Sequence, residues 1–142
     1  MANVHKDFHG ALSYGLQFLD EHFGEEGVRA FLSGLAESVY KPLVEDVRSR
    51  GVAALRDHWQ QVFALEGGEI ELREEDGTLQ LRVLRCPAIA HMKEHNYAVA
   101  ARFCEHTRVV NEAVCRAAGF ECEVEYDQPA GQCVQRFWRA AE

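Results

Sequence analysis

The sequence predicts an α+β fold: a helical amino-terminal half, followed by two hairpins with helices between them that form a four-stranded, mostly antiparallel sheet. Two changes of pattern predict it. Up to residue 66, apolar residues recur every three or four positions, which is helical spacing. In residues 69–83 and 120–138, polar and apolar residues alternate, as in strands with one buried face.

Three helices are expected in the first half. One covers residues 6–23 and ends at Gly24, and the next follows it and meets Pro42, where we expect a kink or a break. The third covers residues 52–65 and ends at a glycine pair. Large apolar side chains are usually buried, so we assign these aromatic residues to the core: Phe18, Phe23, Phe31, Trp59 and Phe63.

The second half begins with a hairpin, because the Asp-Gly pair at residues 76–77 suits a tight type I′ turn. Its second strand ends at Cys86, and Pro87 then opens a short helix, a position that proline favours. We expect a longer helix over residues 97–118 that stops at Gly119, before the second hairpin.

Length and charge limit the kind of protein. We expect residues 1–142 to form a single domain, with residues 1–66 as a helical scaffold and residues 67–142 as the sheet-containing half. The net charge of −8 disfavours nucleic acids and anionic membranes as partners. There is no long apolar run and no signal-peptide core, so we expect a cytoplasmic protein. Its expected partner is a small-molecule ligand or substrate. The helical half would cover the sheet or form a homodimer face.

Five cysteines carry most of the chemical information. In the cytoplasm they are expected to be reduced, and an odd number cannot all pair within one chain. Cys115 and Cys122 are expected to pack as small apolar residues. Cys86, Cys104 and Cys133 fall at a strand end, on a helix and on a strand, and rigid elements of this kind position site residues well.

Two chemical uses of these three cysteines stay open, beside simple packing in the core. A soft metal such as zinc or iron would take Cys86, Cys104 and Cys133 as ligands, with His106 or His95 as the fourth or an open position for water. Alternatively, a cysteine would act as a nucleophile.

For the nucleophilic use, Cys86 is the first candidate. It precedes a helix amino terminus, which lowers the pKa of a thiol. His106 or Glu105 would then transfer protons.

A second pattern involves His91 and His95, which with Glu94 match the His-x-x-Glu-His signature of inverted zinc proteases. That signature requires a further distant ligand and a larger fold, so we interpret these residues as a histidine pair on an exposed helix. His5 and His9 share the same spacing near the amino terminus, and we interpret this spacing as coincidence.

Short motifs in residues 86–137 follow one another in a characteristic order: Cys86-Pro87, Phe103-Cys104, Gly119-Phe120, and Gly131-Gln132-Cys133 followed by Phe137. Their order and spacing resemble the L-2-amino-thiazoline-4-carboxylic acid hydrolase family, in particular its small bacterial members. The resemblance implies a metal- or thiolate-assisted hydrolase that acts on carbon–nitrogen bonds of a small cyclic substrate.

A different function class uses the same cysteines. A non-enzymatic sensor or carrier would bind a metal or small ligand through them, whereas a scaffold subunit would disperse them in its core. An enzyme should instead have a pocket beside the cysteines, with His106 facing it.

Overall fold

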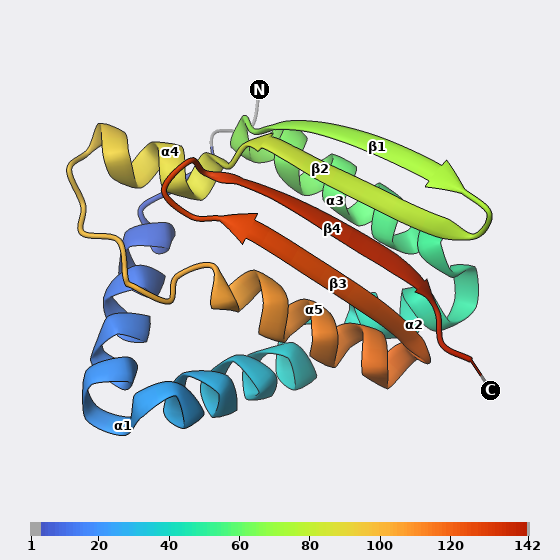
Figure 1. Cartoon of the computed structure of the whole chain (residues 1–142), viewed down its shortest axis with the longest axis horizontal. Helices are drawn as coiled ribbons and strands as arrows, with labels where there is room; N and C mark the ends of the chain where they lie inside the picture. The colour runs from blue at the N-terminus through green and yellow to red at the C-terminus, as the bar shows by residue number, and fades with distance from the viewer. Residues whose placement is uncertain (1–3, 142) are drawn as a thin grey trace.

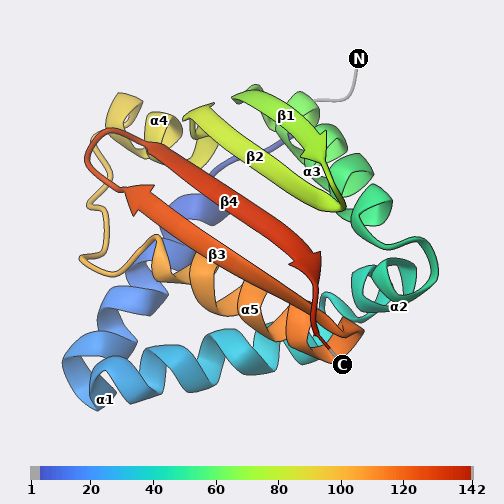
Figure 2. The same ribbon diagram turned by 45° about the vertical axis from the view of Figure 1, so that its right-hand side comes forward.

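The computed structural model describes residues 4–141 and has the predicted α+β architecture. The elements in chain order are α1 (Phe8–Ser38), α2 (Lys41–Arg50), α3 (Val52–Glu66), β1 (Glu69–Glu75), β2 (Thr78–Arg85), α4 (Pro87–Glu94), α5 (Glu105–Ala118), β3 (Phe120–Asp127) and β4 (Gln132–Arg139). The sheet forms one layer and the helices lie on one side of it (Figures 1 and 2). None of the helices within residues 4–141 has both the length and the apolar character of a membrane span.

All strand pairs are antiparallel, in the order β1-β2-β4-β3, so the two hairpins join through β2 and β4. Asp76 and Gly77 have φ angles of 51° and 78°, the left-handed conformations that a type I′ turn requires at both positions. Strand β2 turns Leu79, Leu81 and Val83 toward the helices, where all three are buried. The alternation predicted from the sequence therefore sets which face of the sheet is covered.

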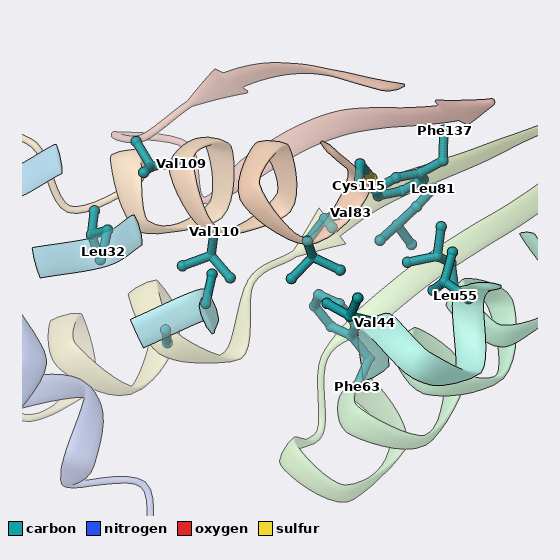
Figure 3. Packing of buried hydrophobic residues seen from close by; sticks show 14 of the residues in the cluster. Leu32, Val44, Leu55, Phe63, Leu81, Val83, Val109, Val110, Cys115 and Phe137 are labelled. Carbon is teal, nitrogen blue, oxygen red and sulfur yellow. The ribbon is translucent and has the colours of Figure 1, made fainter. Parts of the chain in front are cut away.

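The core lies between the sheet and the helices. Helix α3 packs on β1 and β2, α5 packs on β3, and α1 packs on the outer side of α5. Figure 3 shows Phe63 and Leu55 from α3, Val110 from α5 and Phe137 from β4 within this core. Residues at the beginning of α1 line one cavity together with residues of β2 and β4.

Helix α1 departs from the prediction in its buried face. The expected break at Gly24 is present, with φ 71° and ψ −169°, but Phe18, Phe23 and Phe31 are 48%, 65% and 44% exposed. The prediction that they are core residues was wrong. The stripe that packs inward contains the following side chains instead: His9, Ser13, Leu16, Val28, Leu32 and Ala36.

The helix expected over residues 97–118 begins only at Glu105. Before it, residues 97–104 form an irregular segment in which several backbone groups bond to side chains of α1. Ser13 donates to the carbonyl of Ala98 and accepts from the amide of Ala100, while Gln17 accepts from the amide of Ala101. Contacts with α1 thus replace the helical hydrogen bonds, which sequence periodicity does not reveal.

Candidate small-molecule site

A cavity of about 180 Å³ lies between the helices and the sheet; we call it the central cavity. It is bounded by α1, α3 and α5, by strands β2 and β4, and by the start of α4. Its walls are mostly apolar and include Leu12, Leu35, Val62, Phe63, Val83 and Val110. An engineered cavity of roughly 150 Å³ holds benzene, so the central cavity has room for one substituted ring.

A larger hollow of about 740 Å³ lies on the surface between the first half of α1 and residues 97–100. It is wide open, and its lining includes the exposed aromatic residues Tyr14 and Phe18 but no cysteine or histidine. The central cavity instead brings together two cysteines, two histidines and a glutamate, and it is therefore the candidate site.

The most buried acid–base pair in the cavity wall joins His9 of α1 to Glu66 at the end of α3. The Nε2 atom of His9 lies 2.6 Å from the Glu66 carboxylate, and the two side chains are only 9% and 14% exposed. A carboxylate only accepts, so Nε2 is the donor and the ring is held in one orientation. The pair connects the first helix to the junction between α3 and β1.

Cys86 occupies the N-cap position of α4, between β2 and that helix. Its amide donates a 2.9 Å hydrogen bond to the carbonyl of Gly131, which fixes it beside the turn that leads into β4. Burial raises the pKa of the Cys86 thiol above its ordinary value, and the backbone N–H groups of Ala88 and Ile89 offset this effect only in part. The lowered pKa expected from the helix terminus was wrong, because desolvation outweighs the helix amides.

His106 is on the first turn of α5 and lines the same cavity. Its Nδ1 atom lies 2.6 Å from the carbonyl oxygen of Phe103, so Nδ1 carries the proton and Nε2 holds the lone pair. The nearest polar partner of Nε2 is the hydroxyl of Thr107 at 3.4 Å. Burial lowers the pKa of His106, so the imidazole is neutral at pH 7 and its Nε2 is a proton acceptor.

A chain of polar side chains connects α5 to β4 on the sheet side of the cavity. The amide of Asn111 donates to Gln135 at 2.8 Å, and the amide of Gln135 donates to the sulfur of Cys133 at 3.3 Å. Asn111 and Gln135 are buried. Because each side chain orients the next, the Cys133 sulfur is fixed in the cavity wall. Burial is the main cause that raises the pKa of its thiol.

Trp59 from α3 has a buried Nε1–H group that lacks a hydrogen-bond partner, the one such side-chain nitrogen or oxygen within residues 4–141. Its side chain lines the central cavity. Buried donors in folded proteins nearly always have partners, so this unpaired N–H group distinguishes Trp59 from the other residues of the cavity wall.

Two predicted site residues lie outside the cavity lining. Cys104 is the N-cap of α5, where burial, together with the nearby Cys86 and Cys133, raises the pKa of its thiol to about 12. The Glu105 carboxylate accepts hydrogen bonds from Arg108 at 3.0 Å and from Tyr126 at 2.8 Å. Both partners hold Glu105 on the β3 side of α5, and it does not line the cavity.

The predicted metal ligands are only partly brought together. Cys86, Cys133 and His106 line one cavity, and Cys104 lies close enough to interact electrostatically with two of them. Within residues 4–141, however, no group of three or more His, Cys, Asp or Glu side chains is arranged to hold one metal ion. The described residues thus form no ligand set for zinc or iron, and the metal stays a prediction from the sequence.

The two histidines of the protease-like pattern lie on one side of α4, as expected. Their rings are 4.2 Å apart, and Nε2 of His91 contacts the carboxylate of Asp7 at 3.0 Å. Tyr97 donates to the same carboxylate at 2.9 Å. Asp7 and His91 therefore join the beginning of α1 to α4, outside the central cavity.

Sequence reasoning did not identify His9, Glu66 or Trp59 as site residues. One signal for the first was available: His9 and Ser13 share the helical stripe of Leu16, so two polar residues interrupt an inward-facing row. A polar residue on a buried stripe needs a partner, and here the partner of His9 is Glu66. No comparable signal marks Glu66, because its position beside α1 is set by tertiary packing.

Comparison with known proteins adds no assignment. No family model matches the chain, and no curated protein matches it in sequence.

Proposed function

We propose that the protein binds a small, single-ring molecule in the central cavity and hydrolyses a carbon–nitrogen bond in it, as the resemblance to the amino-thiazoline-carboxylate hydrolases implies. The observation that carries the proposal is the meeting of neutral His106, the His9–Glu66 pair and the Cys86 thiol on one mostly apolar cavity. Such a cavity has the size and lining typical of a small-ligand site.

The protonation states support a division of roles for opening a cyclic amidine. Nε2 of His106 accepts a proton from water as the water oxygen bonds to the amidine carbon. The bond from that carbon to the ring nitrogen then breaks, and the leaving nitrogen takes a proton from the Cys86 thiol, which burial keeps protonated at pH 7. The proton on His106 returns to Cys86. The product is one water molecule heavier than the substrate.

The remaining polar groups would orient the ring. Trp59 Nε1–H would donate to an acceptor on the substrate, and the Glu66 carboxylate would face a cationic amidine group. The cavity walls would exclude bulk water from these contacts, which strengthens them.

A second function is ligand binding without turnover, in a sensor or carrier. The raised pKa values of Cys86, Cys104 and Cys133 favour it, because all three thiols are poor nucleophiles at neutral pH.

One assay separates the two functions. The purified protein is incubated with 2-amino-thiazoline-4-carboxylate, and mass spectrometry follows a product heavier by one water molecule. We expect Cys86→Ser and His106→Gln to reduce the rate about a hundredfold or more. Cys122 does not line the central cavity, so Cys122→Ser is the matched control and should keep the wild-type rate. Binding with no product would favour the carrier, and absence of both binding and product would refute the proposal.

A further inference from the structure

Two cysteines that the cavity does not use face each other at the other end of α5. Cys115 is on the buried side of α5, one turn before its end, and is 1% exposed. Cys122 is on β3, on the face that packs against α5, and the tight connection through Gly119 brings the two together. Their side chains interact, and each thiol shifts the pKa of the other. Figure 3 shows Cys115 within the buried side chains near the end of α5.

Access to the two thiols is unequal. Cys122 lines a surface hollow of about 400 Å³ that is bordered by the end of α5 and the end of β4. Arg116 and Trp138 also line this hollow, whereas Cys115 is buried in the core and is not part of the lining. A small reagent from solution therefore reaches Cys122 before Cys115.

The electrostatic surroundings distinguish Cys122 from the other four cysteines. The hydrogen bond from Cys115 lowers the pKa of the Cys122 thiol, and Arg116 acts in the same direction, while burial and Glu112 act against them. The pKa of Cys115 is raised in return, because the Cys122 thiolate holds its proton in place. All three cysteines near the central cavity have raised pKa values. A thiolate is the reactive form, so Cys122 has the greatest nucleophilic character in the chain.

We propose that Cys122 and Cys115 form a dithiol site that reacts with hydroperoxides, with Cys122 as the attacking thiol and Cys115 as the resolving thiol. The Cys122 sulfur attacks one oxygen of hydrogen peroxide and the O–O bond breaks. The second oxygen takes a proton and leaves as water, and Cys122 becomes a sulfenic acid. The Cys115 sulfur then bonds to the Cys122 sulfur and displaces the hydroxyl group as a second water. In total, two thiols lose two hydrogen atoms and the peroxide is reduced to two waters.

The test uses the whole reduced protein and equimolar hydrogen peroxide. After the protein is unfolded in urea and its free thiols are alkylated, peptide mass spectrometry without reductant locates the oxidised cysteines. We expect a disulfide between Cys115 and Cys122 that dithiothreitol reverses, with Cys86 still alkylated. In Cys115→Ala, the sulfenic acid on Cys122 should persist and be trapped by dimedone, and in Cys122→Ala, Cys115 should stay reduced.

Two results would overturn the proposal: oxidation of Cys86 or Cys133 before Cys122, or a sulfenic acid that persists in the wild type without closing a disulfide. Both results are measured on the wild-type protein, so they test the proposal even if a variant of the core cysteine fails to fold. Arg116→Gln provides a surface variant for the electrostatic part of the argument. It should slow alkylation of the reduced Cys122 thiol by iodoacetamide severalfold, and an unchanged rate would contradict the assigned role of the guanidinium.

Discussion

Removing the Glu66 carboxylate tests the buried pair that joins α1 to the rest of the cavity wall. In Glu66→Ala, the ring of His9 would keep its buried position but lose a partner that lies 2.6 Å from Nε2. A buried donor left without its partner costs about 1–3 kcal/mol, and the burial of both side chains, only 9% and 14% exposed, places the expected loss near the upper end, at about 3 kcal/mol.

Glu66→Gln separates the charge from the hydrogen bond. The amide oxygen still accepts from His9, and only the difference between a charged and a neutral acceptor is lost, about 1 kcal/mol. Urea unfolding followed by circular dichroism at pH 7 gives both values. The matched control is Asp46→Asn, the same change in an ion pair with Arg50 at 2.8 Å whose side chains are 42% and 44% exposed. Exposed ion pairs contribute little to stability, so the control should unfold at the same urea concentration as the wild type. If Glu66→Ala unfolds at the same urea concentration as the control, the reasoning on the buried pair is refuted.

Three further outcomes are expected. Gly68→Ala should destabilise the fold by about 1–3 kcal/mol, because an added Cβ would lie 2.6 Å from the ring of Phe63. Gly34→Ala, at a position of α1 where an added Cβ meets no atom within 4 Å, should be neutral or stabilising. Equal urea midpoints for the two variants would contradict this. Burial lowers the pKa of His106 and of His58, so below about pH 6.5 the unfolded chain binds protons that the folded chain does not. As the pH decreases from there, the free energy of unfolding should decrease by at most about 1.4 kcal/mol per pH unit for each histidine. His58→Gln should reduce that slope, measured by urea unfolding at several pH values, and an unchanged slope would exclude His58 as a cause. Alkylation of Cys86 by iodoacetamide should become fast only above pH 9, and rapid labelling at pH 7 would contradict a buried, protonated thiol.

The sequence predicted the sheet better than the helices. The alternation of residues 69–83 and the Asp-Gly pair at 76–77 specify a hairpin locally, since turn type and side-chain period agree. The exposed aromatic residues of α1 and the irregular segment at residues 97–104 could not be predicted in this way. Both depend on how α1 lies against that segment, through side-chain bonds such as those of Ser13.

The candidate site shows the same division between local and tertiary information. Cys86, Cys104 and Cys133 were selected because a strand end, a helix and a strand carry them, with His106 as a further ligand or proton carrier. Cys86, Cys133 and His106 line the central cavity, and Cys104 does not. His9 and Glu66 complete its wall from the other half of the chain. Their pairing depends on where α1 begins relative to the end of α3, and no local pattern encodes that distance.

The most direct test of the central claim, that the cavity binds a small ring, uses Trp59 as a reporter. The other tryptophan, Trp138, bonds to Glu121 on the sheet and does not line the cavity, so Trp138→Phe leaves a single tryptophan in the cavity wall. Titration of this variant with 2-amino-thiazoline-4-carboxylate should produce a saturable change in fluorescence. The change should disappear when Val110→Phe is added, because the larger ring fills the cavity. A signal that does not saturate, or that survives Val110→Phe, would contradict the proposed site.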